Sequence, residues 1–107
     1  PWNFGPSYNS NITVRELVNI VKKRWNDIEV EFEKPKIYES KYLMLDSSKA
    51  YNKLKCNPIW GIDLTINNTI DWYKNYYEKK IVKTDDQIEN FIQDAQKNKI
   101  SWALDVT

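Results

Sequence analysis

Residues 36–77 read KIYESKYLMLDSSKAYNKLKCNPIWGIDLTINNTIDWYKNYY. The stretch opens with an extended apolar run, KYLMLD, that favours a strand over residues 41–46. Asp46 or Ser47 can then cap a short helix that runs through Leu54. Asn57-Pro58 breaks this helix with a turn, because the residue before proline disfavours the helical conformation. This order of parts predicts a strand, a helix and a turn in front of a longer helix.

The longer helix is predicted from Asp63, which can cap it, to the paired tyrosines at 76 and 77. Its apolar residues recur at helical spacing and form one stripe: Ile66, Ile70, Tyr73 and Tyr77. Packing is therefore the better interpretation of the paired tyrosines, although aromatic rings beside lysines can also stack on nucleobases.

Two further helices are predicted on either side of this stretch. Thr13 and Glu16 form a capping box in front of a periodic apolar run, which predicts a helix over residues 14–25. Thr84 and Gln87 form a second capping box, which predicts a last helix over residues 84–95.

Short strands are predicted between and around these helices. Residues 28–33, IEVEFE, alternate strictly between apolar side chains and glutamates, as in a half-buried strand. Residues 1–4 favour another strand, closed by Gly5-Pro6, and residues 100–106 favour a strand or a docked tail. We therefore expect an α+β fold, a small lobe of about four helices with a few short strands that forms one domain over residues 1–107.

Composition excludes several kinds of chemistry. The 107 residues contain 16 basic and 15 acidic side chains, so the net charge of +1 gives no case for nucleic acid or an anionic membrane. There is no histidine, and the single cysteine, Cys56, allows neither an internal disulfide nor a multi-thiolate metal site. No apolar run is long enough to span a membrane. We expect a cytoplasmic protein with no metal site and no catalytic residue in this chain.

The remaining polar and reactive residues favour structural roles. Asp85-Asp86 lie at a predicted helix start, where carboxylates complement the helix dipole, and the glutamates of residues 28–33 form a solvated face. Cys56 favours the interpretation of a small apolar filler, because no histidine exists to activate it.

Four blocks of the sequence, in order, resemble the sugar-nucleotide dehydratases and epimerases of the extended short-chain dehydrogenase/reductase family, and within it the CDP-glucose 4,6-dehydratases. PWNFGP (1–6) is similar to the family's WNFGP, and YESKYLMLDSSKAYNKLKCNPIW (38–60) to its HEA-x-x-L-x-LD-x-x-KA-x-x-x-LGW-x-P-x-W block. TIDWYKNYY (69–77) resembles a T-x-x-WY helix, and TDDQIENF (84–91) a Q-I tail helix. Together the four blocks span residues 1–91, which is most of the chain.

This resemblance implies a C-terminal substrate-binding lobe cut from a longer enzyme. In the family, an N-terminal Rossmann domain binds NAD and carries the catalytic residues, and none of its motifs is present here. The family reaction oxidises C4 of the sugar, eliminates water across C5 and C6, and returns the hydride at C6. The expected partners are the nucleotide-sugar substrate and the parent's Rossmann domain, in a parent enzyme expected to be a homo-oligomer that makes deoxysugars for polysaccharides.

The resemblance also implies which residues meet the substrate. Related epimerases carry an Arg-x-x-Asp pattern before the block, and its register falls on Lys36 and Glu39. Glu39 would then accept the ribose hydroxyls, while Lys36 would hold the diphosphate as a point charge. Tyr38 stands where the family has histidine, and with Lys41 it completes the expected substrate-binding set.

This sequence also departs from the family's LGW motif, because Lys55 and Cys56 stand in place of its glycine and tryptophan. The turn must therefore close without glycine. Leu54, Pro58 and Trp60 are expected to wedge between helices.

Three alternatives stay open at this point. The lobe can belong to an epimerase or dehydratase that uses a dTDP- or UDP-sugar. The chain can also be a free-standing protein-interaction module that uses its aromatic surface, since five tryptophans are many for 107 residues. A binder of single-stranded nucleic acid would need a basic track that the sequence lacks.

Overall fold

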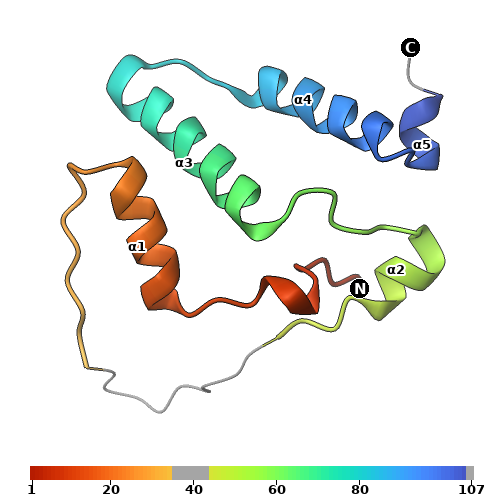
Figure 1. Cartoon of the computed structure of the whole chain (residues 1–107), viewed down its shortest axis with the longest axis horizontal. Coiled ribbons are helices and arrows are strands. Elements are labelled where there is room, and N and C mark those ends of the chain that lie inside the picture. The colour runs from red at the N-terminus through yellow and green to blue at the C-terminus, as the bar shows by residue number, and fades with distance from the viewer. Residues whose placement is uncertain (35–43, 106–107) are drawn as a thin grey trace.

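The computed structural model describes residues 1–34 and 44–105. Within these two ranges the chain forms five α-helices and one short 3-10 helix, with no strand (Figure 1). In chain order these elements are η1 (Tyr8–Ser10), α1 (Val14–Arg24), α2 (Ser48–Leu54), α3 (Ile62–Lys79), α4 (Thr84–Lys97) and α5 (Ser101–Leu104). Helix α3, with 18 residues, is the longest, and no helix in the described ranges is long and apolar enough to cross a membrane.

The predicted α+β class is wrong for the described residues, which are helical with no sheet. Residues 28–33 alternate as predicted, but a strand needs a main-chain partner on a neighbouring segment. Among the described residues, the one main-chain hydrogen bond of this segment runs locally, from Ile28 N to Trp25 O at 3.3 Å. Residues 1–4 are not a strand either, and the segment 100–106 contains helix α5. The predicted strand 41–46 lies partly outside the described residues, and residues 44–46 are not a strand.

The four predicted helices are confirmed to within a few residues. Helix α1 begins with the predicted capping box. The main-chain N–H of Thr13 donates to Glu16 Oε2 at 2.6 Å, and the N–H of Glu16 donates back to Thr13 Oγ1 at 3.2 Å. These bonds satisfy two donors that a helix start otherwise leaves free. They also lower the pKa of Glu16, mainly through the main-chain N–H of Thr13 and then through its hydroxyl.

The predicted second capping box is wrong. Lys83 is the N-cap of α4 and offers no side-chain cap. Thr84 Oγ1 instead accepts a hydrogen bond from Trp72 Nε1 at 2.8 Å, and Gln87 Nε2 donates to the carbonyl of Asn68 at 2.7 Å. Both side chains therefore fasten α4 to α3 rather than closing their own helix.

Two predicted caps differ in detail. The N-cap of helix α3 is Gly61, two residues before the predicted cap Asp63, which lies in the first turn. Ser47 is the N-cap of α2 but makes no side-chain cap. The carboxylate of Asp46 accepts from the hydroxyl of Ser48 and, at 2.9 Å, from its N–H. These bonds, the side-chain bond first, lower the pKa of Asp46.

Three lysines sit in the left-handed region where helices end. Lys55 follows α2 with φ 53°, Lys80 follows α3 with φ 57°, and Lys99 follows α4 with φ 56°. Glycine is the usual residue at such positions because a side chain makes this conformation unfavourable. The turn after α2 thus closes without glycine, as the sequence required.

The core is small and the molecule is open. Helix α1 packs on α3, and α4 packs on α5. Five of the described residues are buried: Ala50, Ile66, Ile70, Ala95 and Ala103. The accessible surface is 9380 Å², where a compact monomer of this size would expose about 6,300 Å². The radius of gyration, 16.6 Å, also exceeds the value of about 13 Å for a compact domain.

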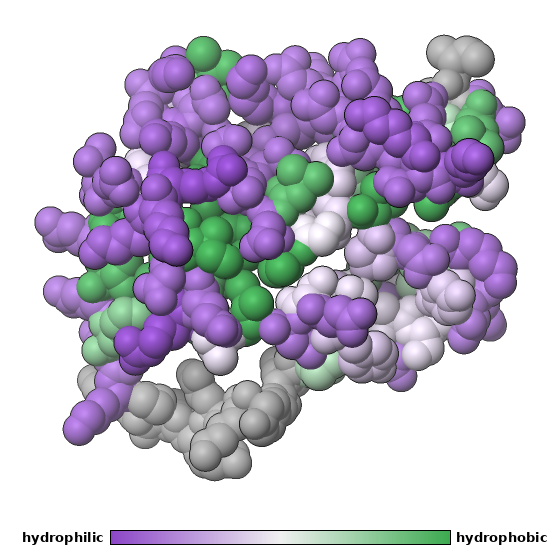
Figure 2. All heavy atoms as spheres, viewed as in Figure 1, coloured by the Kyte–Doolittle hydropathy of each residue, from purple (hydrophilic) through white to green (hydrophobic). Residues whose placement is uncertain are grey.

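Much of the exposed surface is apolar. Figure 2 shows hydrophobic residues in a band between α1 and α3, and an open space between α2 and the α4–α5 part. Along the stripe of α3, Ile66 and Ile70 are buried as predicted, but Tyr73 and Tyr77 are 48% and 58% exposed. The tyrosines stack on each other with ring centroids 6.3 Å apart, and Tyr77 also meets Trp25, the residue that follows α1.

Candidate functional site

An apolar groove of about 740 Å³ lies where three separate segments of the chain meet. Its walls come from the N-terminal segment, from α2 with the residues before it, and from the connection between α2 and α3. The lining residues are Phe4, Gly5, Pro6, Ser7, Tyr8, Ser10, Met44, Leu45, Ser47, Ser48, Ala50, Tyr51, Cys56, Asn57, Pro58, Ile59, Trp60, Ile62, Thr65 and Phe91. This volume falls in the range of sites that hold small molecules.

The N-terminal wall is held against α2 by a close approach at Gly5. A Cβ at this position would lie 3.2 Å from Ser47 Oγ and 3.4 Å from Leu45 Cβ, so glycine allows the two segments to touch. Lys49 adds to this contact, because its Nζ donates to the carbonyl of Pro1 at 3.0 Å and lies 4.4 Å from the ring centre of Trp2. Ser47 Oγ is buried there without a hydrogen-bond partner.

The opposite wall is an aromatic cluster tied to α4. The ring of Trp60 meets Phe91 edge-on with centroids 5.0 Å apart, and Phe91 stacks on Trp102 of α5 at 6.0 Å. Trp60 Nε1 also donates to Asp94 Oδ2 at 3.0 Å. The predicted wedge is therefore confirmed for Trp60, whereas Leu54 and Pro58 are exposed.

The chemistry of this groove is that of a binding surface. Of the described residues that line it, none is charged, so they contain no acid–base pair. Hydrogen-bonding groups come from serines, Tyr51, Asn57 and Thr65. Cys56 is exposed in the wall rather than buried as a filler. The groove can hold a largely apolar face and orient a few polar groups.

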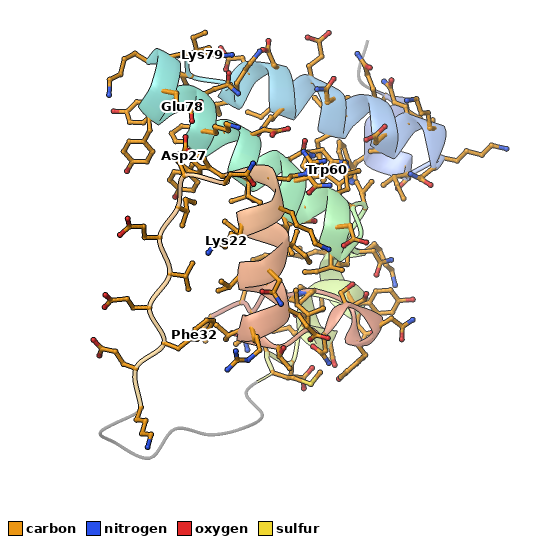
Figure 3. All side chains as sticks on the ribbon, turned by 60° about the vertical axis from the view of Figure 1, so that its left-hand side comes forward. Lys22, Asp27, Phe32, Trp60, Glu78 and Lys79 are labelled. Carbon is orange, nitrogen blue, oxygen red and sulfur yellow. The ribbon has the colours of Figure 1, made fainter. Side chains whose placement is uncertain are left out.

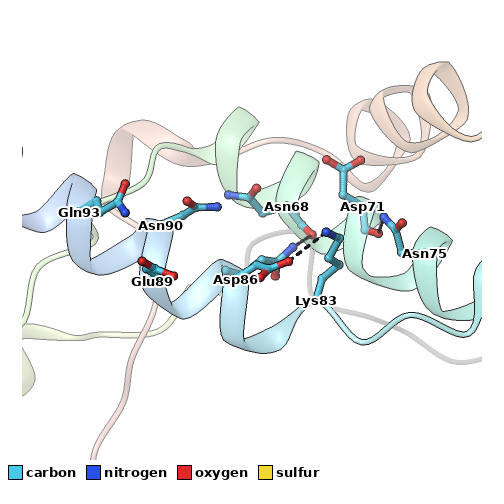
Figure 4. Close-up of a pocket in the computed structure, with 9 residues that line it drawn as sticks. Asn68, Asp71, Asn75, Lys83, Asp86, Glu89, Asn90 and Gln93 are labelled. Atoms are coloured by element: carbon cyan, nitrogen blue, oxygen red, sulfur yellow. Dashed lines mark hydrogen bonds and ion pairs between the residues drawn. The ribbon is translucent and has the colours of Figure 1, made fainter.

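A second, polar concavity of about 460 Å³ lies between α3 and α4 (Figure 4). Its lining residues are Asn68, Asp71, Asn75, Lys83, Asp86, Gln87, Glu89, Asn90 and Gln93. Lys83 Nζ lies 2.9 Å from Asp86 Oδ2, and the Gln87 bond to the carbonyl of Asn68 crosses the floor. Among the described residues there is no group of three acidic, cysteine or histidine side chains that could hold a metal. We interpret this concavity as the polar seam that fastens α4 to α3.

The substrate-binding residues expected from the sequence are Lys36, Tyr38, Glu39 and Lys41, and all four lie outside the described residues. The structure therefore tests neither their position nor their role. Sequence reasoning did not identify the groove, although its signal was present. The groove brings Phe4, Gly5 and Pro6 of the first block together with most of DSSKAY and all of CNPIW from the second block, which lies far from the first block in the chain.

Comparisons with known proteins give one sequence relative. No family model matches the chain, and no solved structure matches it. The chain is 34% identical over 78 residues to the CDP-glucose 4,6-dehydratase of Salmonella typhimurium (strain LT2). The match covers 68% of this chain and 21% of the relative, so this chain spans about a fifth of that protein. By sequence, this chain is thus similar to one region of a sugar-nucleotide dehydratase.

Proposed function

We propose that this chain is the substrate-binding lobe of a CDP-glucose 4,6-dehydratase. The parent enzyme would convert CDP-glucose to CDP-4-keto-6-deoxyglucose with NAD, and this lobe would hold the nucleotide-sugar. The lobe by itself is inactive in this proposal. It supplies binding surface, while the catalytic groups come from the remainder of the parent.

The observation that most supports this proposal is the meeting of separate blocks at one groove. Two blocks that resemble the dehydratase family, PWNFGP and the second block with its DSSKAY and CNPIW parts, both supply residues to a groove of about 740 Å³. The local packing of one helix would not bring residues from these blocks to the same groove. A shared groove is expected if these blocks serve one binding function.

In the proposal, the residues before Met44 contact the nucleotide. Glu39 accepts hydrogen bonds from the two ribose hydroxyls, since a carboxylate has acceptors for both. Lys36 and Lys41 neutralise the diphosphate as point charges, and Tyr38 offers a ring and a hydroxyl to the base. Met44 lies in the groove wall, and these four residues precede it in the sequence by three to eight positions.

The described residues do not fit NAD. A dinucleotide site of this family needs several glycines between a strand and a helix, where the helix start meets the pyrophosphate. This chain has two glycines, Gly5 and Gly61, and α3 begins after Gly61 with no strand before it in the described range. The proposal therefore assigns NAD to a Rossmann domain of the parent and no step to NAD here.

Ligand titration followed by amide NMR tests the binding role. CDP-glucose should shift the amide signals of groove residues such as Ser7, Tyr51 and Asn57, and dTDP- and UDP-glucose should do so less. CDP alone and glucose 1-phosphate separate the contributions of the nucleotide and the sugar. NAD should cause no shift, and no 4-keto sugar should form. Equal weak shifts with all of these compounds would contradict the proposal.

Matched variants link the result to the proposed residues. Glu39→Gln and Lys36→Ala should each weaken CDP-glucose binding about tenfold, the effect of losing one charge-assisted bond. Glu89→Gln is the control, because Glu89 is exposed on α4 and forms no ion pair with another described residue. If Glu89→Gln weakened binding as much as Glu39→Gln, the assignment of the site would be wrong.

A second candidate is favoured by the open shape of the molecule. A surface of 9380 Å² around five buried residues is also expected of a protein-interaction module. The coding sequence upstream of Pro1 distinguishes the two. A glycine-rich strand–turn–helix unit there supports the lobe, and a start codon directly before Pro1 supports the module.

A further inference from the structure

Residues 28–33 run back alongside α1 as an extended segment, apart from the groove (Figures 1 and 3). The main chain of residues 29–34 makes no hydrogen bond to any other described residue. Unpaired N–H and C=O groups along an extended segment are a ready template for another polypeptide. The segment is not a strand, because no described residue pairs with its main chain.

The two faces of this segment differ in polarity and in burial. Ile28 and Val30 are half-buried, whereas Glu29, Glu31 and Glu33 are exposed. Phe32 continues the apolar face at the open end, where it turns toward α1 and the guanidinium of Arg15 lies 4.6 Å from its ring centre (Figure 3). Arg15 of α1 thus contacts one face of the segment, while no described residue pairs with the main-chain edges of residues 29–34, and such contact with a helix is support that an added segment would need.

The acidic face restricts which polypeptide can pair there. None of the three glutamates has an ion pair with another described residue. Along an extended chain, their side chains repeat every 7 Å or so, which is twice the rise per residue. A second copy paired through the same segment would place glutamates opposite glutamates, and like charges directly opposite are destabilising. Lysine or arginine at alternate positions would complement all three.

We propose that residues 28–33 form a docking edge for a partner protein that presents an extended segment with lysine or arginine at every second residue. Main-chain hydrogen bonds between the two segments provide affinity, and the glutamates select the partner and its register. The residues between the basic ones on the partner are apolar, so they extend the face formed by Ile28 and Val30 over α1.

Binding of a designed peptide tests this edge. The probe is a capped nonapeptide that alternates lysine with valine or threonine. It should shift the amide signals of residues 28–34 and of α1, and slow hydrogen exchange at alternate amides between residues 28 and 34. Signals from the groove residues Tyr51 and Trp60 should not change.

Three controls separate main-chain pairing from simple charge attraction. The same peptide N-methylated at alternate amides keeps its charge and loses its donors, so it should bind about tenfold more weakly. A glutamate version of the peptide should not bind. The triple variant Glu29→Gln, Glu31→Gln and Glu33→Gln should also weaken binding about tenfold, while Glu89→Gln should leave it unchanged.

Several outcomes would overturn the proposal. Equal binding of the N-methylated peptide would mean electrostatic adsorption rather than main-chain pairing. Slow exchange of the amides of residues 29–34 in the free monomer would mean that the chain already pairs this edge itself. Concentration-dependent protection of the same amides would assign the edge to a second copy. The absence of binding at millimolar peptide would leave no docking edge at all.

Discussion

The indole Nε1 of Trp60 donates a hydrogen bond to Oδ2 of Asp94 at 3.0 Å, across 34 residues of sequence. Trp60 lies in the connection between α2 and α3, and Asp94 lies on α4. This bond, with the Trp60–Phe91 contact, ties the groove wall to the C-terminal helices.

Trp60→Phe should therefore lower the free energy of unfolding by about 1 kcal/mol, because Oδ2 of the half-buried Asp94 carboxylate loses its donor while an aromatic ring remains. Urea unfolding followed by circular dichroism measures this loss. Trp102→Phe is the matched control, since the Trp102 indole stacks on Phe91 but makes no hydrogen bond to another described residue. If Trp60→Phe were as stable as the unsubstituted chain, the hydrogen bond would contribute nothing to stability.

The capping box of α1 should make stability depend on pH. Because the folded pKa of Glu16 lies below its ordinary value of 4.5, its contribution is complete above that value and is lost as the pH falls through the folded pKa. An NMR titration of the Glu16 carboxylate should therefore give a midpoint below 4.5.

Replacing Thr13 tests the cause of this shift. Thr13→Ala should move the Glu16 midpoint upward and destabilise the chain by about 1 kcal/mol near neutral pH, because the cap hydroxyl is lost. Thr13→Ser keeps the hydroxyl and should preserve both the midpoint and the stability. An unchanged midpoint in Thr13→Ala would mean that its hydroxyl does not contribute to the shift.

The approach of Gly5 to Ser47 predicts non-additive substitutions. Gly5→Ala should cost roughly 1 kcal/mol, because the new methyl group would press on Ser47 Oγ. Ser47→Ala should be neutral or stabilising, since this buried hydroxyl has no partner to lose. In the double variant the cost of Gly5→Ala should largely disappear, which a double-mutant cycle measures.

Gly61→Ala provides the control for this cycle. No atom lies within 4 Å of a Cβ built at Gly61, so its effect should be the same with and without Ser47→Ala. Additive effects of Gly5→Ala and Ser47→Ala would contradict the close contact between them.

Lys55→Gly should stabilise the chain by up to about 1 kcal/mol. Lys55 has φ 53°, a conformation that glycine adopts without the penalty of a side chain. Thermal unfolding measures the gain. Lys53→Gly, inside α2, should instead destabilise by about 1 kcal/mol, because glycine is a poor helix former. A loss of stability in Lys55→Gly would show that the lysine side chain matters more than the backbone there.

The helices could be predicted because their signals are local. Apolar spacing and the Thr13–Glu16 box lie within a few residues of the bonds they form, so sequence alone places α1 correctly. Thr84 and Gln87 have the same local pattern, yet both side chains bond to α3 instead. Nothing in the local pattern distinguishes these two outcomes.

The strand predictions were wrong because strand formation depends on contacts that are not local. Residues 28–33 alternate as a strand should, and their burial follows that alternation in part. The hydrogen bonds of a sheet, however, depend on a second segment that a local pattern does not contain. The groove was also a long-range feature. Its blocks were recognised one by one, but only the fold brings Gly5 and Trp60 to one surface.

In the part of the chain that the structure describes, three of the five buried residues are alanines, at positions 50, 95 and 103. Enlarging any of them adds volume where there is no space, whereas most large apolar side chains have a free side facing water. A complete scan of single substitutions should therefore show an inverted pattern of tolerance. The buried alanines would be the least tolerant of substitution. Many of the exposed tyrosines and leucines would tolerate substitution as long as no partner covers them.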